Sequence, residues 1–237
     1  MFTVKQSCGL GLAFGLLVVS AQAHIPIFSG TDSGDTPENA VFIDDASISH
    51  AVYHEITEDT RQLWVTFDLS ADQEIYVQLG VPVLERLAEF RPTVVVLGPG
   101  FPDVDLPFEI PSGLGGILFT TDEIDEPEFF HEHFTGTDSW IFGELEDVAP
   151  ESGRYYIVAF VPTGETGKLW VAVGRREVFE SRDIATLGEL VPLVSEFHET
   201  TAAGLITPFL PCFAPVVVIG AGLCSGRRLT PSSGERY

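Results

Sequence analysis

The sequence predicts an all-β protein, an antiparallel β-sandwich that is followed by a short helical connector and a C-terminal transmembrane segment. Short apolar stretches recur along the chain between turn residues, and the chain holds 23 glycines and 16 prolines. Short strands at nearly even spacing are typical of a sandwich. An uncharged stretch near the C-terminus adds the expectation of a membrane segment.

Residues 1–23 have the three parts of a signal peptide. Lys5 supplies a positive charge, residues 9–19 form a short apolar core, and Ala21 and Ala23 fit the small-residue pattern of a cleavage site. The apolar core is too short to cross a bilayer. Cleavage after Ala23 makes His24 the first residue of the mature protein and places the following domain outside the cytoplasm.

Residues 24–175 are expected to form the sandwich. A loop rich in Gly, Ser, Asp and Pro is expected over residues 24–37, and a short helical turn over residues 84–90. The last two strands are expected to pair as a hairpin through the turn "TGET". The expected strands are residues 62–69, 74–82, 92–100, 115–121, 140–148, 153–162 and 167–174.

Residues 176–203 are expected to connect the sandwich to a membrane. Within them, apolar residues recur at helical spacing over residues 181–199. Pro192 lies inside this pattern and is expected to break the helix, because proline lacks the backbone donor that a helix interior uses.

Residues 204–224 are expected to form a transmembrane helix. They carry no charge and are long enough to cross the hydrocarbon layer. Arg227 and Arg228 follow in the tail 225–237 and favour the cytoplasmic side, which gives a single-pass protein with an external N-terminal domain. Prolines near the start of this stretch count against a regular helix throughout, so its first part is expected to be interfacial. A poorly packed apolar tail and a removed lipid-anchor signal are the alternatives.

Charge and cysteine content narrow the partners and the environment. The chain has 35 Asp and Glu residues against 12 Lys and Arg residues, for a formal net charge of −23. Such a surface repels phosphate backbones, so nucleic acid is excluded as a partner, and it attracts cations such as Ca²⁺. The three cysteines are Cys8, Cys212 and Cys224, so no disulfide is expected in the sandwich.

Four segments of the sandwich share a recognisable pattern: "DTPENAVFIDD", "QLWVTFDLSADQEIYVQLGVP", "VVVLGPG" and "SGRYYIVAFVPTGETGKLWVAVG". Together they resemble the bacterial pre-peptidase C-terminal (PPC-like) domain over residues 35–174. The resemblance implies a small jelly-roll-like β-sandwich that acts as an accessory or binding module and not as a catalyst. The family usually follows a protease domain, which this chain does not contain. Residues 101–116 and 122–140 look like insertions into the family pattern and are candidates for a specific site.

His24 is the sharpest candidate for chemistry. The α-amine and the ring of an N-terminal histidine chelate Cu²⁺ well, because this ion prefers nitrogen ligands. His131 and His133 in "FFHEHF" are two residues apart, so on a strand their rings face the same side and are expected to share one metal ion with His24. The alternative is that His24 is only the first residue after the cleavage site, with His131 and His133 as ordinary loop histidines.

Two acidic runs are a second candidate for metal binding. Their oxygen ligands suit Ca²⁺, although neither run has the spacing of an EF-hand loop, and solvated loop charge is the alternative. The first run contains Asp32, Asp35 and Glu38, and the second contains Asp122, Glu123, Asp125, Glu126 and Glu128.

Two other sets of residues have simpler interpretations. His50 and His54 are four residues apart, but the surrounding sequence reads as extended chain, so both are expected to be ordinary histidines. Trp64, Trp140 and Trp170 are expected to be core or edge residues, although an exposed pair of aromatic rings would stack on sugars.

The sequence therefore predicts a membrane-anchored, extracytoplasmic accessory or binding protein without catalytic activity. Its expected contacts are the membrane, through the C-terminal helix, and an extracellular protein or glycan. One alternative is a copper-binding protein or oxidase that uses His24 with His131 and His133. The other is a surface glycan-binding module.

Overall fold

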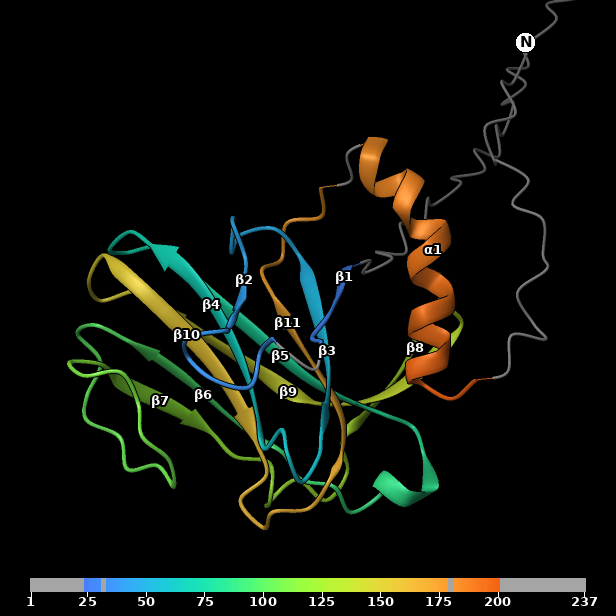
Figure 1. The fold of residues 1–237 in the computed structure, drawn as a ribbon, viewed down its shortest axis with the longest axis horizontal. Helices are drawn as coiled ribbons and strands as arrows, with labels where there is room; N and C mark the ends of the chain where they lie inside the picture. Colours follow the sequence, from blue (N-terminus) through green and yellow to red (C-terminus); the bar gives the residue numbers. More distant parts are fainter. Residues whose placement is uncertain (1–23, 31–32, 179–180, 201–237) are drawn as a thin grey trace, which may run out of the picture. The chain divides into compact units, whose positions relative to one another are not determined.

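Two β-sheets make up most of the described structure (Figure 1). The computed structural model describes residues 24–30, 33–178 and 181–200, with the backbone alone for residues 181–187. One sheet has six strands and the other has five. Both contribute side chains to one shared interior cluster, so the sandwich predicted from the sequence is confirmed.

The strands of each sheet follow an order that differs from their order in the chain. The six-stranded sheet consists of β1 (Ile25–Phe28), β3 (His50–Ile56), β11 (Gly167–Val173), β5 (Glu74–Pro82), β9 (Thr137–Val148) and β8 (Glu128–Glu132). The five-stranded sheet consists of β2 (Val41–Phe42), β4 (Gln62–Leu69), β10 (Gly153–Phe160), β6 (Thr93–Gly98) and β7 (Gly115–Phe119).

Alternation of apolar residues along each strand decides which side chains fill the interior. In β4, Leu63, Val65 and Phe67 point between the sheets and are at most 1% exposed. Val52 from β3 and Val171 from β11 belong to the same cluster, on the opposite sheet. Truncating a buried aromatic such as Phe67 to alanine typically costs about 3–5 kcal/mol, so this cluster holds the two sheets together.

The predicted hairpin between the last two strands is wrong. β10 pairs with β4 and β6, whereas β11 pairs with β3 and β5 in the other sheet. The connection over residues 161–166 therefore passes from one sheet to the other. A turn sequence shows that the chain reverses there, but it does not show which sheet the next strand joins.

Two strand pairs are parallel, which differs from the fully antiparallel prediction. β1 pairs with β3, and β2 pairs with β4. The sequence predicts a loop over residues 25–28, but the Ile25 amide donates to the Ser49 carbonyl and the Ser29 amide to the Tyr53 carbonyl, which makes this segment an edge strand. The jelly-roll-like path stays a prediction.

The insertion-like segment 101–116 covers the outer face of the five-stranded sheet. Trp64 and Phe160 lie on that face, and Phe108 packs against both rings at 5.8 and 5.0 Å between centroids. Leu106 and Ile110 from the same segment join this second apolar cluster. The segment therefore shields an apolar sheet face that would otherwise meet water.

The connector contains a single continuous helix, α1 (Ser181–Phe197), among the described residues. The helix is predicted by the sequence, but the expected break at Pro192 is wrong. Pro192 lacks an amide that would bond the Gly188 carbonyl, and both residues are exposed, so water can satisfy that carbonyl. Near the end of the helix, Leu193 is 44% exposed, whereas Val194 is fully buried.

Several predicted segments lie outside the described residues. These are the signal peptide 1–23, the transmembrane stretch 204–224 and the tail 225–237. In the part of the chain that the structure describes, no helix combines the length and the apolar character needed to cross a membrane. The short turn predicted over residues 84–90 is confirmed as the 3₁₀ helix η1 (Glu85–Leu87).

Candidate functional site

His24 lies just before β1, on the outer face of the six-stranded sheet. Its Nδ1 atom is 2.5 Å from the Ser49 hydroxyl, and its ring centroid is 6.0 Å from that of Trp170. Its Nε2 atom is buried and has no hydrogen-bond partner among the described residues. Burial lowers the pKa of His24, which the negative charge of Glu132 partly opposes. The side chain is therefore a neutral imidazole with one unused nitrogen.

His131 and His133 lie together at the end of β8, as the sequence predicts. Their rings are 4.9 Å apart between centroids, and both residues are exposed. The Nδ1 atom of His131 is 2.6 Å from a carboxylate oxygen of Asp138, directly opposite on β9. Because that carboxylate accepts the Nδ1 proton, the Nε2 atom of a neutral His131 keeps a free lone pair.

The structure does not bring His24 onto the same face as the other two histidines. Residues directly opposite each other on paired strands share a face, so His131 lies on the face of Asp138, while Phe130 lies on the other face with Ser139 and Trp170. His24 contacts Trp170 and is therefore on the face opposite to His131. The three-histidine site stays a prediction, and a shared ion requires the hairpin end to rearrange.

Glu132 faces the His24 side of the sheet. Its carboxylate accepts hydrogen bonds from the Phe134 and Thr135 amides at 2.8 and 2.6 Å, which closes the turn between β8 and β9. Its charge raises the pKa of His24, and it adds to the effect of burial in raising the pKa of Tyr53. The turn at the end of β8 thus lies within electrostatic reach of His24.

The surface around the histidine pair also carries exposed aromatic area. Phe129 is 53% exposed and makes an edge-to-face contact with Trp140 at 5.6 Å between centroids. Trp140 packs against the interior cluster, and Phe129 is directly opposite it on the paired strand. Both side chains therefore lie on the face of the sheet that forms the sandwich interior along its other strands. We call the surface formed by Phe129, His131, His133, Asp138 and Trp140 the hairpin face.

The tryptophans differ in what they offer a ligand. Trp64 and Trp170 are 1% and 4% exposed, so neither is free to stack on a sugar ring in this structure. Trp170 instead donates its indole N–H to the Ser139 hydroxyl at 3.0 Å. Trp140 is half-buried and is the tryptophan that belongs to the hairpin face.

The described residues of the two acidic runs are not gathered into a calcium site. Asp32 lies outside the described residues, and the Asp35 carboxylate accepts a hydrogen bond from the Asn39 amide in a local turn. In the second run, Glu126 and Glu128 line a pocket of about 380 Å³ beside Phe130. Throughout the described part of the chain, no group of three or more His, Cys, Asp or Glu side chains has the arrangement of a metal site. Copper and calcium therefore stay predictions.

Two further histidines lie in an extended segment, as the sequence predicts. His50 and His54 lie on strand β3. The Nδ1 atom of His50 is 2.9 Å from the Ile48 carbonyl, and that of His54 is 2.6 Å from the Ser29 hydroxyl. Burial lowers the pKa of His54 to about 4, so it is neutral at physiological pH.

The sequence did not predict the buried hydrogen bond between Ser139 and His198. Their Oγ and Nε2 atoms are 3.1 Å apart, and both residues are 4% exposed. His198 follows Val194 by four residues, so it continues the buried face of α1. The four-residue spacing could have indicated from the sequence that His198 is buried. Nothing in the sequence indicates that its partner is Ser139.

No family model and no curated protein matches the sequence. Solved structures do match the fold, with low sequence identity. A periplasmic inhibitor of g-type lysozyme from Aeromonas hydrophila is 16% identical, with a TM-score of 0.33 over 63% of this chain and 97% of that one. The pre-peptidase C-terminal domain of a Bacillus anthracis collagenase is 10% identical, with a TM-score of 0.30 over 57% and 95%. A surface-associated copper-binding protein from Methylomicrobium album BG8 is 11% identical, with a TM-score of 0.34 over 61% and 100%. Likenesses this weak assign neither a family nor a function, so the resemblance to the pre-peptidase C-terminal domain stays a prediction.

Proposed function

We propose that this protein is an extracytoplasmic accessory module without catalytic activity, held at a membrane by residues 204–224, that binds a protein or glycan through the hairpin face. One observation carries the proposal. Phe129 has the orientation of an interior residue, yet it is 53% exposed. Among the described residues β8 is the last strand of its sheet, so it has a neighbouring strand on one side only. An aromatic ring left open in this way is the kind of surface that a partner covers.

The chemistry of the hairpin face suits a ligand that combines an apolar surface with hydrogen-bonding groups. The Phe129 ring offers a flat apolar surface, which stacks on a sugar ring or on an apolar side chain. His131, His133 and Asp138 add hydrogen-bonding groups beside it. Aromatic anchors surrounded by polar groups are typical of both protein and glycan interfaces.

A matched pair of substitutions tests this proposal. The full-length protein and its Phe129→Ser and Phe42→Ser variants are applied to an oligosaccharide array, and a photo-crosslinking residue is placed at position 129 or 42 for protein partners. Phe42 is 52% exposed but lies on β2, in the other sheet, so it controls for loss of an exposed aromatic ring. We expect Phe129→Ser to weaken binding at least tenfold and Phe42→Ser to leave it unchanged.

Two results count against the proposal. Equal binding by both variants would place the interface elsewhere on the molecule. Release of the full-length protein from membranes by an alkaline carbonate wash would remove the membrane anchor from the proposal, while leaving the hairpin face as a binding surface.

A second candidate function is transition-metal binding, which the contact between His131 and Asp138 favours. A carboxylate that holds the Nδ1 proton of a histidine fixes the ring and makes Nε2 a better ligand. His133 lies beside it, so the two imidazoles can hold a borderline ion such as Cu²⁺. This candidate differs from the three-histidine prediction because it does not require His24.

Titration with Cu²⁺ alone distinguishes these forms of the site. We expect His131→Gln and His133→Gln each to abolish binding, and Asp138→Asn to weaken it by about 10–100-fold, because Asp138 orients a ligand. His50→Gln is the control and leaves the affinity unchanged. One extra residue before His24, in the protein cleaved after Ala23, lowers the affinity only if the α-amine is a ligand. An unchanged affinity for Cu²⁺ in both His131→Gln and His133→Gln excludes this metal site.

A further inference from the structure

The C-terminal end of α1 rests on an aromatic layer on the outer face of the six-stranded sheet. The Tyr53 ring lies at the centre of this layer. Its centroid is 5.0 Å from that of Phe28, 5.1 Å from that of Phe197 and 5.9 Å from that of His198. Trp170 continues the layer at 6.5 Å from Tyr53. The last turn of α1 therefore covers aromatic surface that its removal would expose.

A chain of hydrogen bonds joins the helix end to the sheet beneath it. The Trp170 indole N–H donates to the Ser139 hydroxyl at 3.0 Å, and that hydroxyl is 3.1 Å from Nε2 of His198. The Nδ1 atom of His198 is 2.9 Å from the Val194 carbonyl. An indole N–H only donates and a carbonyl only accepts, so His198 carries its proton on Nδ1 and accepts the Ser139 proton on Nε2. With His198 neutral, every donor and acceptor in this series of hydrogen bonds has a partner.

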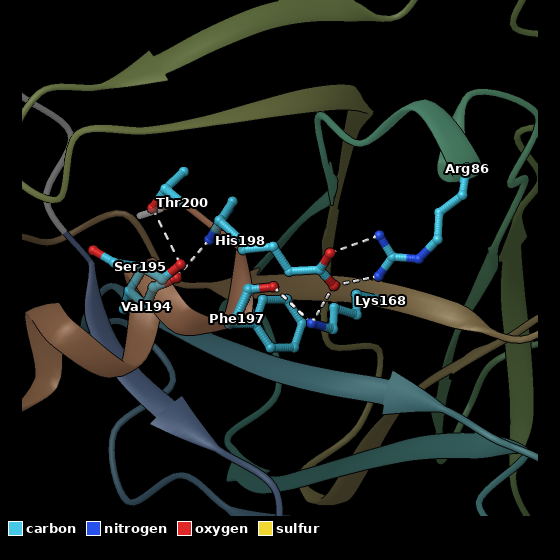
Figure 2. Close-up of polar contacts among 8 residues, drawn as sticks. Arg86, Lys168, Val194, Ser195, Phe197, His198 and Thr200 are labelled. Carbon is cyan, nitrogen blue, oxygen red and sulfur yellow. Dashed lines mark hydrogen bonds and ion pairs between the residues drawn. The ribbon is translucent and has the colours of Figure 1, made fainter. Parts of the chain in front are cut away.

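The polypeptide leaves α1 through a Schellman motif, and Figure 2 shows Thr200 beside Ser195 at this point. The Thr200 amide donates to the Ser195 carbonyl and the Glu199 amide donates to the Glu196 carbonyl, both at 3.0 Å. Glu199 occupies the left-handed position of this motif, with φ of 56°, where glycine is usual.

Two basic side chains hold Glu199 in that position. Its carboxylate accepts hydrogen bonds from Lys168, at 2.8 Å, and from Arg86 (Figure 2). Lys168 also donates to the Phe197 carbonyl at 3.1 Å, which satisfies one of the unpaired carbonyls at the helix end. The helix end is thus attached by an exposed ionic contact and a buried neutral one.

We infer that the last turn of α1 is an acid-sensitive latch, which is docked on the sheet while His198 is neutral and is released when His198 takes up a proton. A second proton on the imidazole would sit on Nε2 and reverse this hydrogen bond, so that the Ser139 oxygen would accept from both His198 and Trp170 and the Ser139 proton would lose its acceptor. It would also place a positive charge inside the aromatic layer. Release exposes the Tyr53 ring, which Phe197 and His198 cover in the docked state. The inference is independent of the hairpin face as a binding surface.

The charges around His198 decide how strongly protonation is opposed. Burial lowers its pKa most, and Lys168 on β11 lowers it further. The Val194 carbonyl, Asp138 on β9 and Glu132 on β8 act in the opposite direction without cancelling the effect of burial. Glu199 is already paired with Lys168 and Arg86, and Tyr53 on β3 is uncharged because burial raises its pKa.

The net lowering of the His198 pKa sets the direction of the pH effect. The pKa of His198 is below its ordinary value when the latch is docked and returns towards about 6.5 when it is released. The released state therefore binds more protons, so docking is strongest above pH 6.5 and weakens as the pH falls below it. At pH 5.0 the ordinary pKa limits the weakening to about 30-fold relative to neutral pH.

Hydrogen exchange of residues 194–200 in the full-length protein tests the latch. Exchange is measured at pH 7.5 and 5.0 and expressed as protection factors, which removes the intrinsic pH dependence of exchange. We expect protection in the wild type to fall by about 5–30-fold at the lower pH. His198→Gln keeps an acceptor for Ser139 but cannot titrate, so its protection is expected to change less than twofold. His50→Gln keeps the full wild-type response.

A second measurement covers the case in which His198→Gln fails to dock. In wild-type protein with ¹⁵N-labelled histidine, the nitrogen shifts of His198 report its tautomer and its titration directly. The latch requires the Nδ1–H tautomer at pH 7.5 and a pKa below 6.5. A pKa at or above 6.5, equal protection at the two pH values, or an unchanged pH response in His198→Gln would each overturn the inference.

Discussion

Substitution of Gly80 by alanine is expected to destabilise the protein through Trp170. Gly80 on β5 lies directly opposite Trp170 on β11, and the indole ring lies against the glycine. A Cβ atom at position 80 would be 2.2 Å from two carbons of that ring. Such a distance is far inside van der Waals contact, so either the ring or the strand must move.

The structure allows the size of the effect to be worked out. Trp170 is 4% exposed, belongs to the same buried outer cluster as Ala51 and Ala172, and donates to Ser139, so its ring is held in place on this face of the sheet. Overpacking of a buried site costs about 1–3 kcal/mol. Loss of the Trp170–Ser139 hydrogen bond adds about 1 kcal/mol. Together they give a loss of about 2–4 kcal/mol in the free energy of unfolding.

Urea unfolding of the full-length protein in detergent, followed by near-ultraviolet circular dichroism, measures this loss. Gly188→Ala is the matched control, because no atom lies within 4 Å of a Cβ built there. Alanine is the better helix former, so this variant is expected to gain up to about 1 kcal/mol. A Gly80→Ala variant within 0.5 kcal/mol of the wild type, on the order of the usual effect of a surface substitution, would refute the packing argument.

Three further predictions address other parts of the molecule. Because the pKa of His54 is lowered to about 4 in the folded protein, the stability it contributes is complete above pH 6.5 and falls by up to about 3 kcal/mol as the pH drops towards 4. Urea midpoints of His54→Gln should therefore depend less on pH in this window than those of the wild type, and equal slopes would contradict this. Phe129→Ser removes an exposed ring and should leave the melting temperature within about 2 °C of the wild type, whereas a larger drop would show that Phe129 supports the fold. Gly98→Ala places a Cβ 2.1 Å from the buried Tyr155 ring and should destabilise by about 1–3 kcal/mol in thermal unfolding, a result that an unchanged transition would exclude.

The strands were predictable where the sequence alternates. Residues 62–69 and 74–82 were expected as strands and are β4 and β5 within those bounds. Alternate burial of side chains leaves a clear pattern in the sequence because one face of each strand meets the core. β1 was not predicted, because Ile25–Phe28 is half-buried throughout and has no such alternation.

The candidate site was predictable only in part. The positions of His131 and His133, two residues apart, indicated correctly that their rings lie together. The partners that define their chemistry, Asp138 on β9 and the exposed Phe129, depend on which strands pair and where the sandwich ends. Neither the pairing of the strands nor the edge of the sandwich is encoded in a local stretch of sequence.

The sequence by itself determined that this chain builds a β-sandwich with one helix after it, because strand and helix periodicity are local properties of the residues. Only the tertiary structure decided that β10 and β11 lie in different sheets and that His24 faces away from His131. It also decided that the Ser139 hydroxyl joins the His198 imidazole to the Trp170 indole through hydrogen bonds. These outcomes follow from strand order and register, and a shift of one residue in register reverses the face of every side chain on a strand. Contacts between residues about 60 positions apart, such as Ser139 and His198, are selected by the whole packed core and not by their neighbours in the chain.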